Sequence, residues 1–268
     1  MLVHCVDELI VLGSRCILET GPAVNGWSTD IWRMTEADVS VAIDAYAALL
    51  STGIEQDDEV AALLNDAGID FKSLLIGVGE GTEKITRGDL CELVLAATLI
   101  GEGSDPDRMV MPNVPKMSRR KSDSGIDIFE AASDATTSGT ALQAHERLGL
   151  TSVKHSIKAD TSDLRYKLIA SLSETELNPG YVMSQLRWLA GHMEASGWTK
   201  AQSRRLFLFS RDFPHKDHVS LMAGAVVDSA AESHMLNQLK QLPENADRSA
   251  HFRVVTFPGL TTAHTRCG

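Results

Sequence analysis

The sequence predicts an α/β fold in which helices flank a mixed central β-sheet, preceded by a mainly helical N-terminal region. Two observations support this fold class. After residue 85, amphipathic segments with helical spacing alternate with short apolar segments of strand character, an order typical of a mixed sheet with helices on its faces. The chain has 268 residues, 43% of them apolar and 23% charged, which is ordinary for a globular protein. We therefore expect an N-terminal region over residues 1–85 and a core over residues 86–268.

Helices are expected where apolar residues recur at helical spacing between capping residues and glycines. The clearest helix spans residues 86–103, where Thr86 can cap the N-terminus, Asp89 suits the first turn and Gly101 ends the helix. Residues 1–20 leave a first strand and a first helix open. The other expected helices span residues 35–53, with Thr35 as the N-cap, and residues 57–68, 160–174 and 178–197.

Strands are expected in short apolar segments that lie between turn residues. Two of them, residues 124–132 and 150–158, are separated by a polar turn and are expected to form a hairpin. A loop is expected over residues 21–27. The remaining expected strands span residues 204–210, residues 217–229 before a helix that runs to about Leu239, and residues 251–259.

The two strands of this hairpin carry an acid and a lysine. Asp127 lies between two isoleucines, so we expect it to point to the face opposite them. Lys154 shares its parity with Ser152, so both should project away from the apolar face, while His155 should face the other layer. A carboxylate and an ammonium on the same side of neighbouring strands would meet. Metal-dependent phosphodiester cleavage uses such a pair, because the carboxylate holds a divalent metal and the lysine faces the charge of the phosphate and the attacking water.

Glu92 lies among apolar residues of the clearest helix, where a carboxylate is costly unless it is paired, exposed at the helix edge or bound to a metal. A salt bridge at the helix edge is the simplest explanation. The alternative is that Glu92 joins Asp127, because two neighbouring carboxylates require a cation between them. Glu92 is therefore a candidate metal ligand.

The net charge of −11 and the isoelectric point of about 5.2 argue against a protein that coats nucleic acid non-specifically. They leave room for an enzyme with a local basic patch. Such a run precedes Asp127, and it is either a solvated loop or a contact surface for the phosphates of a substrate. Its members are Lys116, Arg119, Arg120 and Lys121.

The cysteines form no CxxC pair, so a reduced cytoplasmic protein is the simplest expectation and structural zinc is not expected. No apolar run approaches the roughly 18–20 residues of a membrane helix, and the start of the chain lacks the basic region of a signal peptide. We therefore expect no membrane association. The cysteines are Cys5, Cys16, Cys91 and Cys267.

The order of these features resembles the PD-(D/E)XK nuclease superfamily. The segments that carry the resemblance are GDLCELVLAATLI around Glu92, the basic segment that begins PK at Pro115, GIDIF around Asp127, and SVKHS around Lys154. More narrowly, they are similar to the nuclease subunits of Hachiman anti-phage systems. The resemblance covers roughly residues 86–200, and the layout of the C-terminal strands is also similar.

The resemblance implies a restriction-endonuclease-like core and a metal-dependent DNA nuclease of prokaryotic anti-phage defence. Glu92 matches the glutamate of the family's helix, Asp127 the motif aspartate and Lys154 the motif lysine. Asp127 and Glu92 would bind Mg²⁺ or Mn²⁺, and all three residues would be catalytic. The partners implied are DNA and a helicase-like protein.

The sequence departs from this family at one position, because Ser152 occupies the place of the second motif acid, two residues before Lys154. A serine hydroxyl is a weak ligand for Mg²⁺ and supplies no charge. Either another carboxylate takes its place, with Glu92, Glu130 and Glu146 as candidates, or the site is impaired. The alternative function is therefore a catalytically degenerate nuclease fold that binds DNA or a partner protein.

Overall fold

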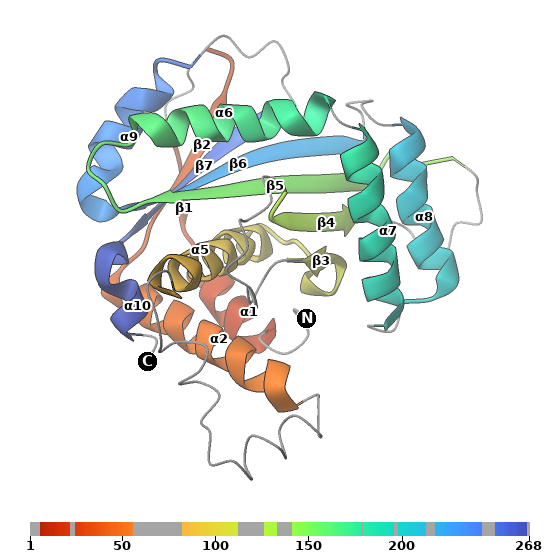
Figure 1. Cartoon of the computed structure of the whole chain (residues 1–268), viewed down its shortest axis with the longest axis horizontal. Helices are drawn as coiled ribbons and strands as arrows, with labels where there is room; N and C mark the ends of the chain where they lie inside the picture. Colours follow the sequence, from red (N-terminus) through yellow and green to blue (C-terminus); the bar gives the residue numbers. More distant parts are fainter. Residues whose placement is uncertain are drawn as a thin grey trace.

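The computed structural model describes residues 6–21, 25–55, 82–111, 126–132, 141–177, 179–195, 198–212, 218–242 and 250–266. Within these ranges, seven strands form one mixed sheet with helices on both faces, which confirms the predicted α/β fold (Figure 1). The strands are β1 (Leu18–Thr20), β2 (Ser28–Arg33), β3 (Met109–Val110), β4 (Ile128–Ala132), β5 (Arg147–Ser156), β6 (Val219–Asp228) and β7 (Ala250–Phe257).

The strand order is β1-β2-β7-β6-β5-β4-β3. The four strands β2, β7, β6 and β5 are parallel, whereas β1, β4 and β3 each run antiparallel to their neighbour in this order. Parallel strands are normally covered on both faces. β6 follows this rule, since it is buried over almost its whole length.

The helices divide between the two faces of the sheet (Figure 1). A core on one face takes its residues from α1, α2, α5 and α10, and a core on the other face from α6, α7, α8 and α9. We call these the α5 face and the α6 face. The helices are α1 (Val6–Ser14), α2 (Glu36–Glu55), α5 (Thr82–Gly101), α6 (Ser162–Leu177), α7 (Pro179–Ala195), α8 (Lys200–Asp212), α9 (Glu232–Leu239) and α10 (Ala263–Arg266).

The prediction of a strand over residues 204–210 is wrong, because this segment lies inside α8. Its alternating apolar residues suit a strand, yet Ser203, Leu206 and Phe209 are buried at intervals of three residues, which is helical spacing. Tertiary packing against α7 selects the helix. The short strands β2 and β3 were missed, and the helix predicted over residues 57–68 lies outside the described residues.

The helix of Glu92 is longer than predicted. α5 begins at Thr82, so the prediction that Thr86 caps it is wrong: Thr86 is a buried residue of the second turn. α5 ends at Gly101, as expected. In α2, the backbone N–H of Asp38 donates to Oγ1 of Thr35 over 3.3 Å, which confirms Thr35 as the N-cap.

The residues before 86 contribute to the same sheet as the rest of the described chain, because β2 pairs with β7. α1 also packs closely on α5. A Cβ atom at Gly13 would lie 2.9 Å from the carbonyl oxygen of Ala97, and one at Gly101 would lie 2.6 Å from the carbonyl oxygen of Gly13. The sheet thus takes strands from both sides of residue 85, and the division of the chain there stays a prediction.

α5 crosses the sheet obliquely, and two contacts fix its path. Leu95 packs onto Gly224 of β6, where an added Cβ atom would lie 2.6 Å from Cδ1 of Leu95. Three residues later, Oγ1 of Thr98 accepts a hydrogen bond of 2.8 Å from the buried side chain of Arg253 on β7. One helical turn along α5 therefore corresponds to one strand of the sheet.

In the described ranges, no helix combines the length and apolar character that crossing a membrane requires.

The contact between Gly224 and Leu95 predicts a stability effect. Gly224→Ala should lower the free energy of unfolding by about 1–3 kcal/mol, because the new methyl group overpacks a fully buried leucine. Urea denaturation would measure the change. Gly191→Ala is the control, since this glycine lies in α7 with open space around its Cα, and the change should stabilise by about 0.5–1 kcal/mol. Equal effects at the two glycines would contradict the close packing of α5 on β6.

Candidate active site where strand β4 meets strand β5

Asp127 starts the pairing between β4 and β5. Its backbone N–H donates to the carbonyl oxygen of Thr151 over 2.9 Å, and the antiparallel register then pairs Ile128 with Thr151. Its side chain turns back along β5, so that Oδ2 accepts a hydrogen bond of 2.6 Å from the backbone N–H of Val153. The carboxylate thus takes the place that a backbone carbonyl would hold in a longer ladder.

The structure brings Asp127, Ser152 and Lys154 together. Nζ of Lys154 lies 3.6 Å from Oδ2 of Asp127 and donates a hydrogen bond of 3.0 Å to Oγ of Ser152. The Ser152 hydroxyl in turn donates to Oδ2 of Asp127 over 3.4 Å. Ser152 is fully buried and Asp127 is 8% exposed, whereas the side chain of Lys154 is 23% exposed. The ion pair is therefore largely withdrawn from water, and the lysine is its accessible member.

The faces of the sheet differ from the expectation. Ser152 and Lys154 share a side of β5 opposite to Val153, as predicted, but the expectation that this side is not apolar is wrong. Leu148 and Leu150 share their parity and belong to the core of the α6 face, and Val153 belongs to the core of the α5 face. Since helices cover both sides, neither face of β5 is solvated along its length. Lys154 reaches solvent because it is close to the end of the strand.

Glu92 approaches the site from α5. It lies three residues before Leu95 and therefore shares a face of the helix with it. Leu95 packs over Gly224, whose neighbour on β5 is Val153, and α5 is in contact with β5. Glu92 therefore lies on the same side of α5 as Leu95, on a helix that packs against β5. Glu92 is only 3% exposed, so its carboxylate belongs to the interior.

Asp127 and Glu92 are the two candidate carboxylate ligands for Mg²⁺. In the part of the chain that the structure describes, no three His, Cys, Asp or Glu side chains gather closely enough to hold a metal ion by themselves. Mg²⁺ is usually bound by one or two carboxylates, with water and substrate phosphates as the other ligands. Asp127, where β4 meets β5, and Glu92, on a helix that packs on β5, are carboxylates of the type that such coordination uses.

Neither of the other two glutamates compensates for Ser152. Glu146 is fully buried and forms an ion pair with Arg205 of α8, with 2.8 Å between Oε1 and Nε. Glu130 pairs with Gly149, three residues from Ser152, which corresponds to roughly 10 Å along the strand. The basic run is not placed, because Lys116, Arg119, Arg120 and Lys121 lie outside the described residues.

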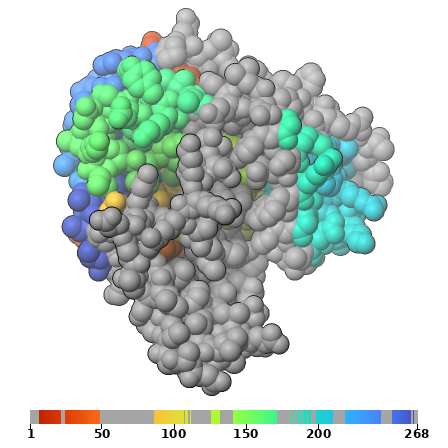
Figure 2. All heavy atoms as spheres, in the orientation of Figure 1, coloured from red at the N-terminus to blue at the C-terminus, as the bar shows by residue number. Residues whose placement is uncertain are grey.

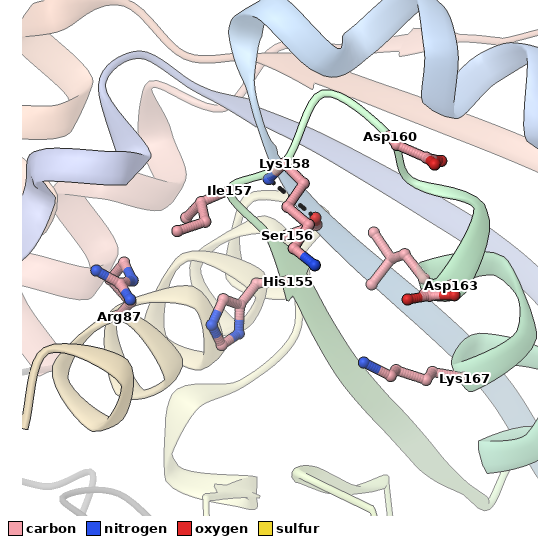
Figure 3. Close-up of a pocket in the computed structure, with 9 residues that line it drawn as sticks. Arg87, His155, Ser156, Ile157, Lys158, Asp160, Asp163 and Lys167 are labelled. Carbon is pink, nitrogen blue, oxygen red and sulfur yellow. Dashed lines mark hydrogen bonds between the residues drawn. The ribbon is translucent and has the colours of Figure 1, made fainter. Parts of the chain in front are cut away.

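Sequence reasoning missed a pocket of about 210 Å³ that lies just beyond Lys154 (Figure 3). Three elements line it: the first part of α5, the end of β5 with the turn after it, and the first part of α6. The available signal in the sequence was the presence of basic residues in the first part of α5, in the turn after β5 and in the first part of α6. These positions lie close in sequence to Glu92 and Lys154. The lining includes Arg87, His155, Ser156, Lys158, Asp160, Asp163 and Lys167. Figure 2 shows the surface of the molecule in the orientation of Figure 1, with the green atoms of α6 at the upper left and the blue-green atoms of α7 and α8 at the right.

Comparison of the sequence with models of protein families gives no match, and comparison with curated proteins gives none either. The geometry of the site therefore has to carry the functional argument, together with the resemblance of its short motifs.

The bond between Asp127 and Val153 predicts a difference between two substitutions. Asp127→Ala should lower the free energy of unfolding by about 1–3 kcal/mol, because it leaves the buried N–H of Val153 without its acceptor. Asp127→Asn should lower it less, since the amide oxygen can accept the same bond. Chemical denaturation would compare them. Asp105→Ala is the control, because its exposed ion pair with Arg108 contributes about 0–1 kcal/mol. If Ala and Asn were equally destabilising, the proposed role of this hydrogen bond would be wrong.

Proposed function

We propose that the chain is a metal-dependent DNA nuclease that hydrolyses phosphodiester bonds. The observation that carries the proposal is the close approach of Asp127 and Lys154, at 3.6 Å, on neighbouring strands. A carboxylate next to an accessible lysine suits phosphodiester chemistry, because one can hold a divalent cation while the other faces an anionic phosphate. The motif resemblance to PD-(D/E)XK nucleases supports the same assignment.

Asp127 and Glu92 would hold Mg²⁺ or Mn²⁺ in this proposal. When bound, the metal would polarise the scissile phosphate and lower the pKa of a water molecule. Lys154 would donate hydrogen bonds to the attacking water and to a phosphate oxygen, and its charge would stabilise the negative charge that builds up in the transition state. Ser152 would position Lys154, since its hydroxyl accepts a hydrogen bond from Nζ. Hydrolysis forms a bond from the water oxygen to phosphorus and breaks the bond to the leaving oxygen.

The proposed setting is prokaryotic anti-phage defence in the cytoplasm, with a helicase-like protein as partner. The motif resemblance supports this setting. The net charge of −11 also fits it, because an acidic chain binds DNA weakly unless a partner delivers the strand. The basic residues Lys116, Arg119, Arg120 and Lys121 would contact backbone phosphates, which contribute affinity without sequence information.

A second candidate is a nuclease fold without catalysis that binds DNA or a partner protein. The specific observation in its favour is Ser152, which stands where the motif has an acid. Its hydroxyl is buried, hydrogen-bonded to Lys154 and Asp127, and carries no charge. A site with one carboxylate fewer binds a divalent cation less tightly.

Cleavage assays test the first proposal. Plasmid DNA, single-stranded DNA and RNA would each be incubated with Mg²⁺ or Mn²⁺ and, separately, with EDTA. The unmodified chain should cleave only with metal. Lys154→Met should reduce the rate by roughly 100-fold or more, the loss typical of a group that stabilises charge in the transition state. Asp127→Asn should abolish cleavage while keeping the fold.

The matched control for Lys154→Met is Lys200→Met, which removes the same charge from an exposed position at the start of α8. It should cleave like the unmodified chain. Full activity of either Asp127→Asn or Lys154→Met would remove this site from the mechanism.

Restoring the motif acid separates the two candidates. If the chain is a degenerate nuclease, Ser152→Glu should create metal-dependent cleavage where the unmodified chain has none, because it returns a carboxylate next to Asp127 and Lys154. Ser152→Gln is the control of similar size without the charge. Robust cleavage by the unmodified chain, with no gain in Ser152→Glu, would favour the first candidate instead.

A further inference from the structure

The pocket beyond Lys154 lies at the carboxyl end of β5. β5, β6 and β7 are parallel, and ligands of open α/β sheets bind outside the carboxyl ends of such strands. The antiparallel partner β4 begins at Ile128, opposite Thr151, so among the described strands the last residues of β5 have a neighbour only on the β6 side. α5 and α6 close the space at this strand end (Figure 3).

The lining of the pocket is rich in positive charge. Figure 3 shows Arg87 and His155 on one side of it and Lys167, on α6, on the other, with Lys158 on the turn after β5. This turn is fixed, because the backbone N–H of Lys158 donates to Oγ of Ser156 over 3.1 Å. Two lysines and an arginine thus line one pocket in a chain whose net charge is −11.

The two acids in the lining offset only part of this charge. Asp160 accepts hydrogen bonds from the backbone N–H and the hydroxyl of Ser162, over 2.9 and 2.6 Å, and so caps the start of α6. These hydrogen bonds from Ser162, and to a smaller extent the charges of His234 and Lys158, hold the pKa of Asp160 below its usual value. Asp160 therefore stabilises the start of α6, and Asp163 lies in the first turn of α6, where a carboxylate complements the helix dipole. Three permanent positive charges outnumber these two acids, which favours an anionic ligand.

The size of the pocket limits the ligand. Its volume is about 210 Å³. Pockets that enclose a whole small molecule usually measure about 300–1,000 Å³, so this one is too small for a complete nucleotide. A phosphate group that belongs to a longer chain fits both the size and the charge.

We infer that this pocket binds a phosphate group of the DNA strand, next to the phosphate that would lie at Asp127 and Lys154. Ser156 lines the pocket two positions after Lys154 on β5 and shares its parity, so the two places lie on the same side of one strand. The inference rests on the proposed function, because it takes DNA as the ligand. The phosphate is either an internal phosphodiester or a terminal 5′-phosphate, which share the chemistry that the pocket recognises.

Binding measured in EDTA tests the pocket without cleavage. The probe is a fluorescein-labelled single-stranded oligonucleotide, followed by anisotropy across a range of salt concentrations. The double variant Lys158→Gln, Lys167→Gln removes two exposed charges of the pocket. We expect it to bind roughly five- to tenfold more weakly than the unmodified chain. The slope of log K against log salt should fall by about 0.7 for each phosphate that the variant no longer neutralises.

The matched control is the double variant Lys200→Gln, Lys240→Gln, which removes two exposed lysines from the start of α8 and the end of α9. It changes the net charge equally and should bind like the unmodified chain. Equal affinities and equal salt slopes for the two double variants would overturn the inference. So would an absence of DNA binding by the unmodified chain.

Two further arms identify the source of the phosphate. The oligonucleotide is used with and without a 5′-phosphate, and inorganic phosphate is added as a competitor. If binding depends on the 5′-phosphate, and this dependence is lost only in the pocket variant, the pocket binds strand ends. If the oligonucleotide without a 5′-phosphate binds equally well, the pocket binds internal phosphodiesters. Because binding and cleavage are measured separately, a chain that binds through the pocket but does not cleave contradicts the nuclease proposal and leaves this inference standing.

Discussion

The site depends on one hydrogen bond, in which the backbone N–H of Val153 donates to the carboxylate of Asp127 over 2.6 Å. This bond replaces a rung of the ladder between β4 and β5 and fixes an acid in the plane of the sheet. Lys154 follows Val153 in the chain, so the same short piece of strand sets both the acid and its cation. Because Ser152 contacts both, three consecutive residues of β5 hold the charge pair.

The position of Glu92 follows from how α5 lies on the sheet. Gly224 has no side chain, and Leu95 fills the space above it. Arg253 anchors the other half of α5 through Thr98 and Glu102. The helix therefore cannot slide along the strands without breaking both of these interactions. The buried carboxylate of Glu92 is therefore held one helical turn before Leu95.

Much of the fold follows from local patterns, and the misses have local causes. The start of α2 at Thr35 and the end of α5 at Gly101 could be predicted, because capping residues and terminal glycines act within one helical turn. The segment around Leu206 was assigned to a strand because alternation in a short window resembles a strand, and only packing on α7 distinguishes the two. The prediction for Lys154 assumed a sheet with one apolar face and one solvated face. A sheet covered on both faces has no solvated side, and this depends on helices distant in sequence.

The candidate site was harder to predict from the sequence than the fold. The meeting of Asp127 and Lys154 could be predicted because a hairpin needs only two strands and a turn. The pocket could not, since it joins Arg87 of α5 to Lys167 of α6 across the end of β5. Such a juxtaposition depends on the whole order of the strands. The pairing of Glu146 with Arg205 is another case, because it links two elements that no local pattern relates.

The pairing of β2 with β7 also has a consequence for how the molecule is made. Ser28 is opposite His251, which is 251 − 28 = 223 positions later in the chain. β7 separates β2 from β6 in the sheet, so β2 cannot dock until β7, which ends at Phe257, has left the ribosome. Contacts so distant in sequence slow folding, and β2 keeps an apolar, unpaired edge during synthesis. The newly made chain is therefore exposed to aggregation for longer than a protein built from local hairpins.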